Sequence, residues 1–170
     1  MNKFEILYDI DDKSWETLSF SVSETIEKTK EATLKIVTDL VWFLKENKNF
    51  SINLCLSNDE TVHHLNKTFR NMDKPTNVLS FANIDGEDFE DILEKQTDIE
   101  LGDIIISFER LKAESEELDV PFEDHFKHLL AHGILHILGY DHMIDEERLE
   151  MEKIEIDILS QLGVPDPYQE

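Results

Sequence analysis

Three histidines in the stretch HGILHILGYDH, residues 132 to 142, have a spacing that suits a single metal ion. His132 and His136 are four residues apart, so on a helix they lie on one face, one turn from each other. Gly139 can end that helix sharply, because glycine readily adopts a left-handed backbone conformation. The chain can then return to the same ion, and the sequence predicts His132, His136 and His142 as metal ligands.

The chemistry of such a centre follows from its three neutral imidazoles. They leave at least one coordination position for water, as catalytic metal sites do. The ion lowers the pKa of that water and polarises an oxygen bound beside it. Metzincin peptidases have similar histidine spacing, but their general base is a glutamate directly after the first histidine. Here that residue is Gly133, so the sequence favours a hydrolase whose substrate is not a peptide.

Two neighbours of the triad have open roles. His128 lies one turn before His132 and could hydrogen-bond a ligand, replace one, or simply belong to an amphipathic helix. Asp141 could orient a ligand through its second ring nitrogen, or steady the turn after the helix. Either residue could be a general acid, as could a second water. His63 and His64 belong to another helix and are predicted at the surface.

A locally basic stretch, KTFRNMDK, precedes a predicted strand. Lys67, Arg70 and Lys74 surround the single acid Asp73 in an otherwise strongly acidic chain. A planar, permanently charged guanidinium suits a phosphate that gains charge during cleavage. We therefore predict that Lys67, Arg70 and Lys74 bind substrate, although an arginine at a helix end could also form only a surface ion pair.

The elements that must position these residues are predicted from hydrophobic periodicity and end signals. Strands are expected over residues 3–10, 50–57, 75–82 and 101–108. Helices are expected over residues 23–47, 57–70, 107–118, 121–138 and 144–162. This order predicts a single α+β domain over residues 1–170, with a small mixed sheet of about four strands packed against helices. The metal-binding helix lies near the C-terminus.

The predicted ends and faces of the first two helices rest on individual residues. Ser23 is the expected N-cap of the first helix, whose apolar stripe includes Leu40. Ser57 and Glu60 have the capping-box spacing at the start of the second helix. The apolar face of that second helix includes Phe69.

Composition limits the class of protein. Among 170 residues, 39 acids against 16 bases give a net charge of −23, which argues against broad nucleic-acid binding; no DNA partner is expected. A single cysteine, Cys55, indicates a reducing compartment. No apolar run approaches the ~20 residues of a membrane span, and no secretory signal is visible, so we expect a cytoplasmic protein without membrane contacts. Residues 84–99 are very acidic and are expected as a surface insertion.

The histidine stretch resembles the signature of the YbeY family, bacterial metal-dependent endoribonucleases involved in ribosomal RNA maturation. LNKTFRNMDKPTNVLSF, residues 65–81, and LGDIIIS, residues 101–107, resemble two other blocks of that family, in the same order. The resemblance implies one ion on the three histidines, usually Zn²⁺, with another divalent metal possible. It also implies that Arg70 and His132 are catalytic.

The resemblance further implies a single-strand-specific endoribonuclease that acts in small-subunit (16S) rRNA maturation and ribosome quality control. Because of the net charge of −23, we expect weak binding of naked RNA, and action on the small ribosomal subunit or with ribosomal proteins. Two alternatives remain at the level of sequence. One is a zinc metallohydrolase of another substrate, including a peptidase with an unrecognised base; the other is a ribosome-associated factor with little turnover.

Overall fold

Strands and helices follow one another irregularly along the chain, and a computed structural model describes residues 3–169. The strands are β1 (Lys3–Ile10), β2 (Asn49–Ser57), β3 (Val78–Ala82) and β4 (Asp98–Ser107). The α-helices are α1 (Val22–Val37), α2 (Asp59–Arg70), α3 (Phe89–Lys95), α4 (Phe108–Leu118), α5 (Phe122–Ile137) and α6 (Asp145–Gln161). Two short 3-10 helices, η1 (Lys13–Thr17) and η2 (Asn83–Asp85), complete the described elements.

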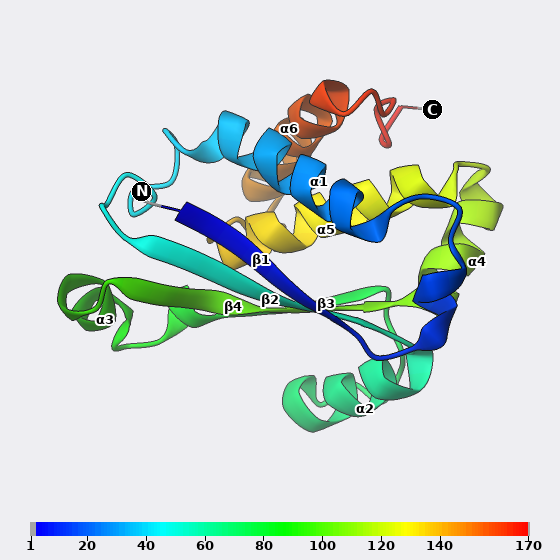
Figure 1. Cartoon of the computed structure of the whole chain (residues 1–170), viewed down its shortest axis with the longest axis horizontal. Coiled ribbons are helices and arrows are strands. Elements are labelled where there is room, and N and C mark those ends of the chain that lie inside the picture. Colours follow the sequence, from blue (N-terminus) through cyan, green and yellow to red (C-terminus); the bar gives the residue numbers. More distant parts are fainter. Residues whose placement is uncertain (1–2, 170) are drawn as a thin grey trace.

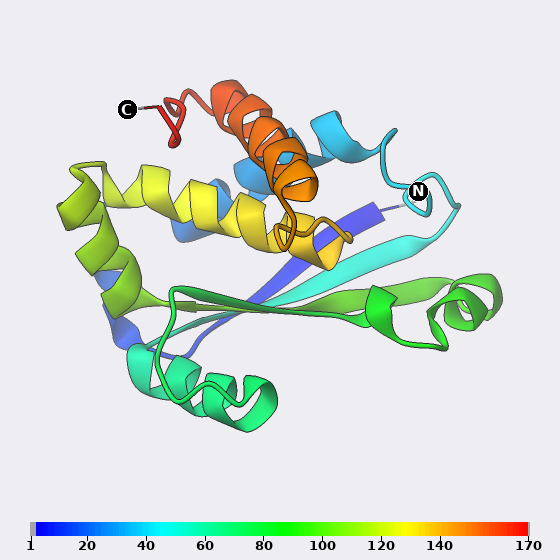
Figure 2. The same ribbon diagram turned by 180° about the vertical axis from the view of Figure 1, so that it is seen from behind.

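The sheet is mixed and has the strand order β1-β2-β4-β3. β1 pairs with β2, and β2 with β4, in parallel, while the edge strand β3 runs antiparallel to β4. Helices α1, α5 and α6 cover one face of the sheet, and α2 lies on the opposite side (Figure 1, Figure 2). The predicted α+β domain with a small mixed sheet of four strands is confirmed. None of the helices within residues 3–169 is both long and apolar enough to cross a membrane.

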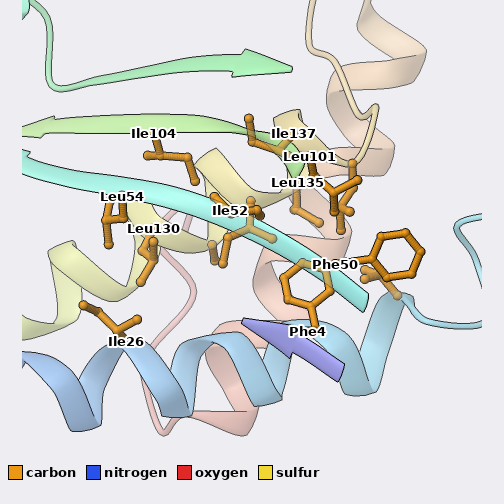
Figure 3. Packing of buried hydrophobic residues seen from close by; sticks show 14 of the residues in the cluster. Phe4, Ile26, Phe50, Ile52, Leu54, Leu101, Ile104, Leu130, Leu135 and Ile137 are labelled. Carbon is orange, nitrogen blue, oxygen red and sulfur yellow. The ribbon is translucent and has the colours of Figure 1, made fainter. Parts of the chain in front are cut away.

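The main core lies between the sheet and the helices that cover it. Alternate side chains of β2, among them Ile52 and Leu54, are buried, as the two-residue period of a strand requires. They share one cluster with Leu130 and Leu135 of α5 (Figure 3). The helix that carries His132 and His136 is therefore fixed on a rigid sheet.

Helix α1 begins earlier and ends earlier than predicted. Its N-cap is Ser21, whose Oγ accepts a hydrogen bond from the Glu24 N–H at 3.3 Å, so the assignment to Ser23 was wrong. The helix ends at Val37 and not near residue 47, within a β-branched run of low helix propensity. The chain then turns, and Leu40 is 60% exposed instead of lying in the apolar stripe.

The start of α2 also differs from the capping-box prediction. The N-cap is Asn58, whose side-chain oxygen accepts from the Thr61 N–H at 2.9 Å. Ser57 instead ends β2 and donates its hydroxyl hydrogen to Asp11 at 2.7 Å. A side chain committed to a distant partner cannot cap the local helix. The predicted apolar face of α2 is also incomplete, because Phe69 is 66% exposed.

The acidic segment 84–99 contains more regular structure than its weak periodicity indicated. It includes the end of η2, all of α3 and the beginning of β4. Phe89 and Leu93 are buried in the main core, whereas the acids around them are exposed. Two apolar anchors therefore hold the segment against the domain.

Gly102 of β4 lies at a close approach between the sheet and the metal-binding helix. A Cβ on this residue, whose φ is +153°, would lie 2.2 Å from the Phe81 carbonyl oxygen and 2.7 Å from Cδ1 of Ile137. Both contacts are too short. We therefore expect Gly102→Ala to lower the free energy of unfolding by about 1–3 kcal/mol, as measured by urea denaturation.

Gly86→Ala is the matched control for this substitution. Its Cβ would lie 3.1 Å from a side-chain oxygen of Asp88, which can move, and 3.2 Å from the Asn83 carbonyl oxygen, a far milder contact than the 2.2 Å at Gly102, and its φ of −73° suits any residue. We expect its midpoint to stay close to wild type. Equal midpoints for Gly102→Ala and Gly86→Ala would contradict the close approach.

Candidate metal centre

Helix α5 places the first two histidines of the triad. It begins directly after its N-cap residue Pro121, whose fixed φ suits the start of a helix. Glu123 and Asp124 in the first turn interact favourably with the positive end of the helix dipole. Gly139 ends it with a φ of +108°, as the sequence predicted. The chain then turns back, so that His142 follows within six residues of His136.

The three predicted ligands converge. Nitrogen atoms of His132, His136 and His142 all lie within 4.8 Å of one another. Nε2 of His132 is 3.0 Å from Nε2 of His136. The first two rings are partly buried, whereas His142 is exposed on the turn. One ion could contact all three rings while still facing solvent on the His142 side.

The hydrogen bonds of the first two rings fix which nitrogens carry protons. Nδ1 of His136 donates to the carbonyl oxygen of Tyr140 at 3.0 Å, and Nδ1 of His132 donates to Glu155 at 2.5 Å. A carbonyl and an ionised carboxylate can only accept, so both neutral rings present a lone pair on Nε2. Two lone pairs 3.0 Å apart repel unless a proton or a metal ion lies between them. The donor set therefore fits a divalent ion such as Zn²⁺.

Electrostatics keep His136 neutral. Burial, followed by the neighbouring His132 and His142, lowers the pKa of His136 to about 4. The hydrogen bond to Tyr140 acts in the opposite direction but is outweighed. An imidazole that is neutral at neutral pH is ready to bind a metal.

Glu155 of α6 is a member of the site that sequence reasoning missed. Its side chain is entirely buried. Burial would raise its pKa, but the neighbouring His128, 3.6 Å away, and the hydrogen bonds from His132 and Tyr168 outweigh this effect and lower the pKa to about 2. The available signal was its place on the apolar face of α6, one turn after Met151.

Gly133, the residue in the place of the peptidase glutamate, faces the sheet and not the metal centre. A Cβ there would lie 3.2 Å from two side-chain carbons of Ile104 and 3.4 Å from the hydroxyl of Ser80. A side chain at this position would therefore press on Ile104 of β4. It would point toward the sheet and away from the metal centre, so the position is not suited to a peptidase base.

The triad lies on one side of a cleft of about 580 Å³. The same cleft is lined by the end of α2, the following loop and β3, including Arg70, Lys74 and Ser80. The cations Arg70 and Lys74 therefore share one cavity with the triad, together with the carboxylates of Asp85 and Asp141.

Arg70 is held in place within this wall. Its guanidinium donates to the Ser80 carbonyl oxygen at 2.5 Å and lies over the ring of Phe81, 5.2 Å from the centroid. Asn71 follows with a left-handed φ of 54° and ends α2. Loop residue Lys74 is fixed through its carbonyl oxygen, which accepts from the Asn66 side chain at 2.9 Å.

The other predicted site residues take different places. Lys67 is exposed on α2, outside the lining of the cleft. His128 also lies outside that lining, with Nε2 3.2 Å from the Tyr168 hydroxyl. Asp141 lines the cleft, and its carboxylate accepts from the His142 N–H at 2.7 Å. Of its two predicted roles, Asp141 takes the turn-steadying one, while a carboxylate from α6 contacts the ligand ring.

Fold and site together define an α+β domain with a candidate hydrolytic metal centre, and comparison with known proteins gives the family. The model of the family described as Endoribonuclease YbeY matches residues 10–163. The Endoribonuclease YbeY of Zymomonas mobilis is 43% identical over 130 residues, covering 76% of this chain and 74% of the relative. That of Paramagnetospirillum magneticum is 47% identical over 119 residues, covering 70% and 71%. The chain belongs to the YbeY family.

A solved structure supports the fold alone. The solution structure of TM1509 from Thermotoga maritima matches with a TM-score of 0.56 and 22% identity. The match covers 98% of this chain and 96% of that one. The arrangement of sheet and helices is therefore shared by an experimentally determined structure.

The pKa of His136 predicts a pH dependence of stability in metal-free protein. Its ordinary pKa of 6.5 is lowered to about 4 by folding, so the unfolded chain binds more protons between these values. Stability is therefore lost as the pH falls through 6.5 towards 4. With chelator present, we expect the urea midpoint to be lower at about pH 5 than at about pH 7.5.

His136→Gln removes the titrating group, so the urea midpoint of this variant should fall less than that of wild type between about pH 7.5 and about pH 5. The exposed His64 provides the control, because His64→Gln should fall as much as wild type. An identical decrease in wild type and His136→Gln would show that His136 is not the source.

Proposed function

We propose that this protein is a single-strand-specific, metal-dependent endoribonuclease that acts in 16S rRNA maturation and ribosome quality control. The observation that carries the proposal is that the histidine triad and Arg70 line one cleft. Membership of the Endoribonuclease YbeY family supports the reaction class. His132, His136 and His142 would hold one ion, Zn²⁺ or another divalent metal.

In this reaction a bound ion supplies an activated water and a Lewis-acid contact for a phosphate oxygen. Arg70 binds the same phosphate and stabilises the negative charge that develops during cleavage. Its contacts with Ser80 and Phe81 orient the guanidinium before substrate binds. Lys74 binds a neighbouring phosphate, and Lys67, outside the cleft lining, acts at most on RNA that continues beyond it. The group that protonates the leaving oxygen stays unassigned among Asp141, which lines the cleft, His128, which lies outside the lining, and a second water.

The size of the cleft supports a single-stranded substrate. A volume of about 580 Å³ is that of a small-molecule site, which holds one or two nucleotides but not both strands of a helix. Unpaired RNA can be threaded into such a cavity because its backbone is flexible. We expect delivery by the small ribosomal subunit or its proteins in the cytoplasm, since a net charge of −23 opposes binding of free RNA.

Three variants test the proposal, with metal content and cleavage measured on the same preparations. Arg70→Ala should retain about one ion and lose cleavage of single-stranded RNA by about 10²–10³-fold, because transition-state charge is no longer stabilised. His136→Ala should lose both the ion and cleavage. Lys28→Ala removes one exposed charge from α1 and should cut like wild type.

Duplex RNA of the same sequence and small-subunit particles complete the design. We expect the duplex to stay intact and the particles to be cut at lower protein concentration than naked RNA. Metal-loaded wild type that leaves every RNA intact would refute the nuclease assignment. Chelator-sensitive cleavage of peptides in that case would favour a metallohydrolase of another substrate.

A further inference from the structure

Glu155 is the most deeply buried acid of the site, and its charge has an unusual set of neighbours. The carboxylate is 0% exposed, yet its ion pairs within residues 3–169 involve only His128 and His132. Burying an ionised carboxylate is costly unless positive charge and hydrogen bonds compensate for lost water. No lysine or arginine of the described chain does so here. The compensating charge must come through the imidazoles.

Both oxygens of Glu155 are occupied. Oε1 accepts from Nδ1 of His132 at 2.5 Å, and Oε2 accepts from the hydroxyl of Tyr168 at 2.5 Å. Tyr168 belongs to the segment that follows α6 and returns to α5, where its hydroxyl also meets His128. Figure 2 shows this C-terminal segment above α5. The two hydrogen bonds therefore fix the orientation of the carboxylate, and the carboxylate in turn fixes the orientation of the His132 ring.

The three rings of the triad are not supported equally. His136 is held by a neutral carbonyl at the end of its own helix. The ring of His142 makes no hydrogen bond to any part of the chain between residues 3 and 169. Only His132 contacts a negative charge, and that contact joins two helices. A carboxylate on the second nitrogen makes the ligating nitrogen more basic and fixes its direction.

We propose that Glu155, oriented by the hydroxyl of Tyr168, is a positioning residue that fixes the tautomer and direction of His132 and strengthens metal binding. This inference rests on the proposed metal centre. It assigns a role to the C-terminal segment, which ties α6 to the metal-binding helix. The pair acts on the ion through His132 and does not touch substrate.

Zn²⁺ affinity tests this role directly, by competition with a chromophoric chelator. Glu155→Gln keeps the shape but removes the charge, and we expect affinity to fall about 10–100-fold. Tyr168→Phe removes one hydroxyl and should have a smaller effect in the same direction. Asp157→Asn removes the same charge from an exposed site on α6 and should bind Zn²⁺ like wild type.

Co²⁺-loaded protein gives a readout that a purely structural role would not change. We expect the visible absorption bands of Glu155→Gln to differ from wild type, because the ligand field of the reoriented His132 changes. Asp157→Asn should keep the wild-type bands. Glu155→Met, an apolar replacement of similar volume, guards against misfolding of the glutamine variant. It should fold and bind Zn²⁺ more weakly than Glu155→Gln.

The outcomes separate the two proposals. Folded Glu155→Gln and Glu155→Met proteins with wild-type affinity and wild-type Co²⁺ spectra would overturn the positioning role and leave the metal centre standing. Folded wild type that binds neither Zn²⁺ nor Co²⁺ would overturn the metal centre, and the positioning role with it. Thermal melting of the metal-free proteins establishes that each variant is folded.

Discussion

Two imidazole nitrogens on successive turns of one helix must point their lone pairs at each other, and the site is organised around this requirement. Nε2 atoms 3.0 Å apart need a proton or a metal ion between them, and a metal ion satisfies both neutral rings at once. Both rings must then carry their proton on Nδ1, where an acceptor has to meet it. Tyr140 and Glu155 provide these two acceptors, one from the helix end and one from α6. The turn at Gly139 places Tyr140 within reach of His136.

The same requirement constrains the packing of α5 on the sheet. A helix that carries ligands on one face must bury the other face tightly, or the ligand nitrogens would shift with it. Gly133 and Gly102 allow this close approach, because a Cβ at either position would meet its neighbours at 3.2 Å or less. The missing peptidase glutamate is thus a consequence of how the metal-binding helix is seated, and it fits a site whose substrate needs no such base.

Local patterns in the sequence were enough to single out three histidines that converge in the structure, whereas the long-range contacts around them could not be inferred. His132, His136 and their helix follow from a four-residue spacing and one glycine, so they could be predicted without tertiary information. The contact of Glu155 with His132 spans 23 residues, and that of Tyr168 with His128 spans 40. Only the packing of α6 and its tail on α5 creates these contacts. The one local sign of these contacts in the sequence was Glu155, a charged residue on the apolar face of α6.

The predicted N-caps of α1 and α2 were wrong for a related reason. Ser57 has the local chemistry of an N-cap, but its hydroxyl donates to Asp11, directly after the neighbouring strand β1, and Asn58 caps the helix instead. Lys67 and Arg70 are three residues apart and have similar chemistry, yet only Arg70 reaches the cleft. Which of several equivalent side chains faces a partner depends on where a helix ends in space. Sequence spacing alone cannot fix that.

The overall charge of −23 and the cationic wall of the cleft act over different distances. Charges separated by more than about 8 Å are largely screened at physiological ionic strength. Inside the cleft, the field is therefore set by Arg70 and Lys74, by the carboxylates of Asp85 and Asp141, and by the ion that the triad would hold. The distant acids act on encounter, where they repel free RNA. Local chemistry suited to a phosphodiester, combined with a surface that disfavours RNA, is the physical reason for proposing that a partner presents the RNA strand to this site.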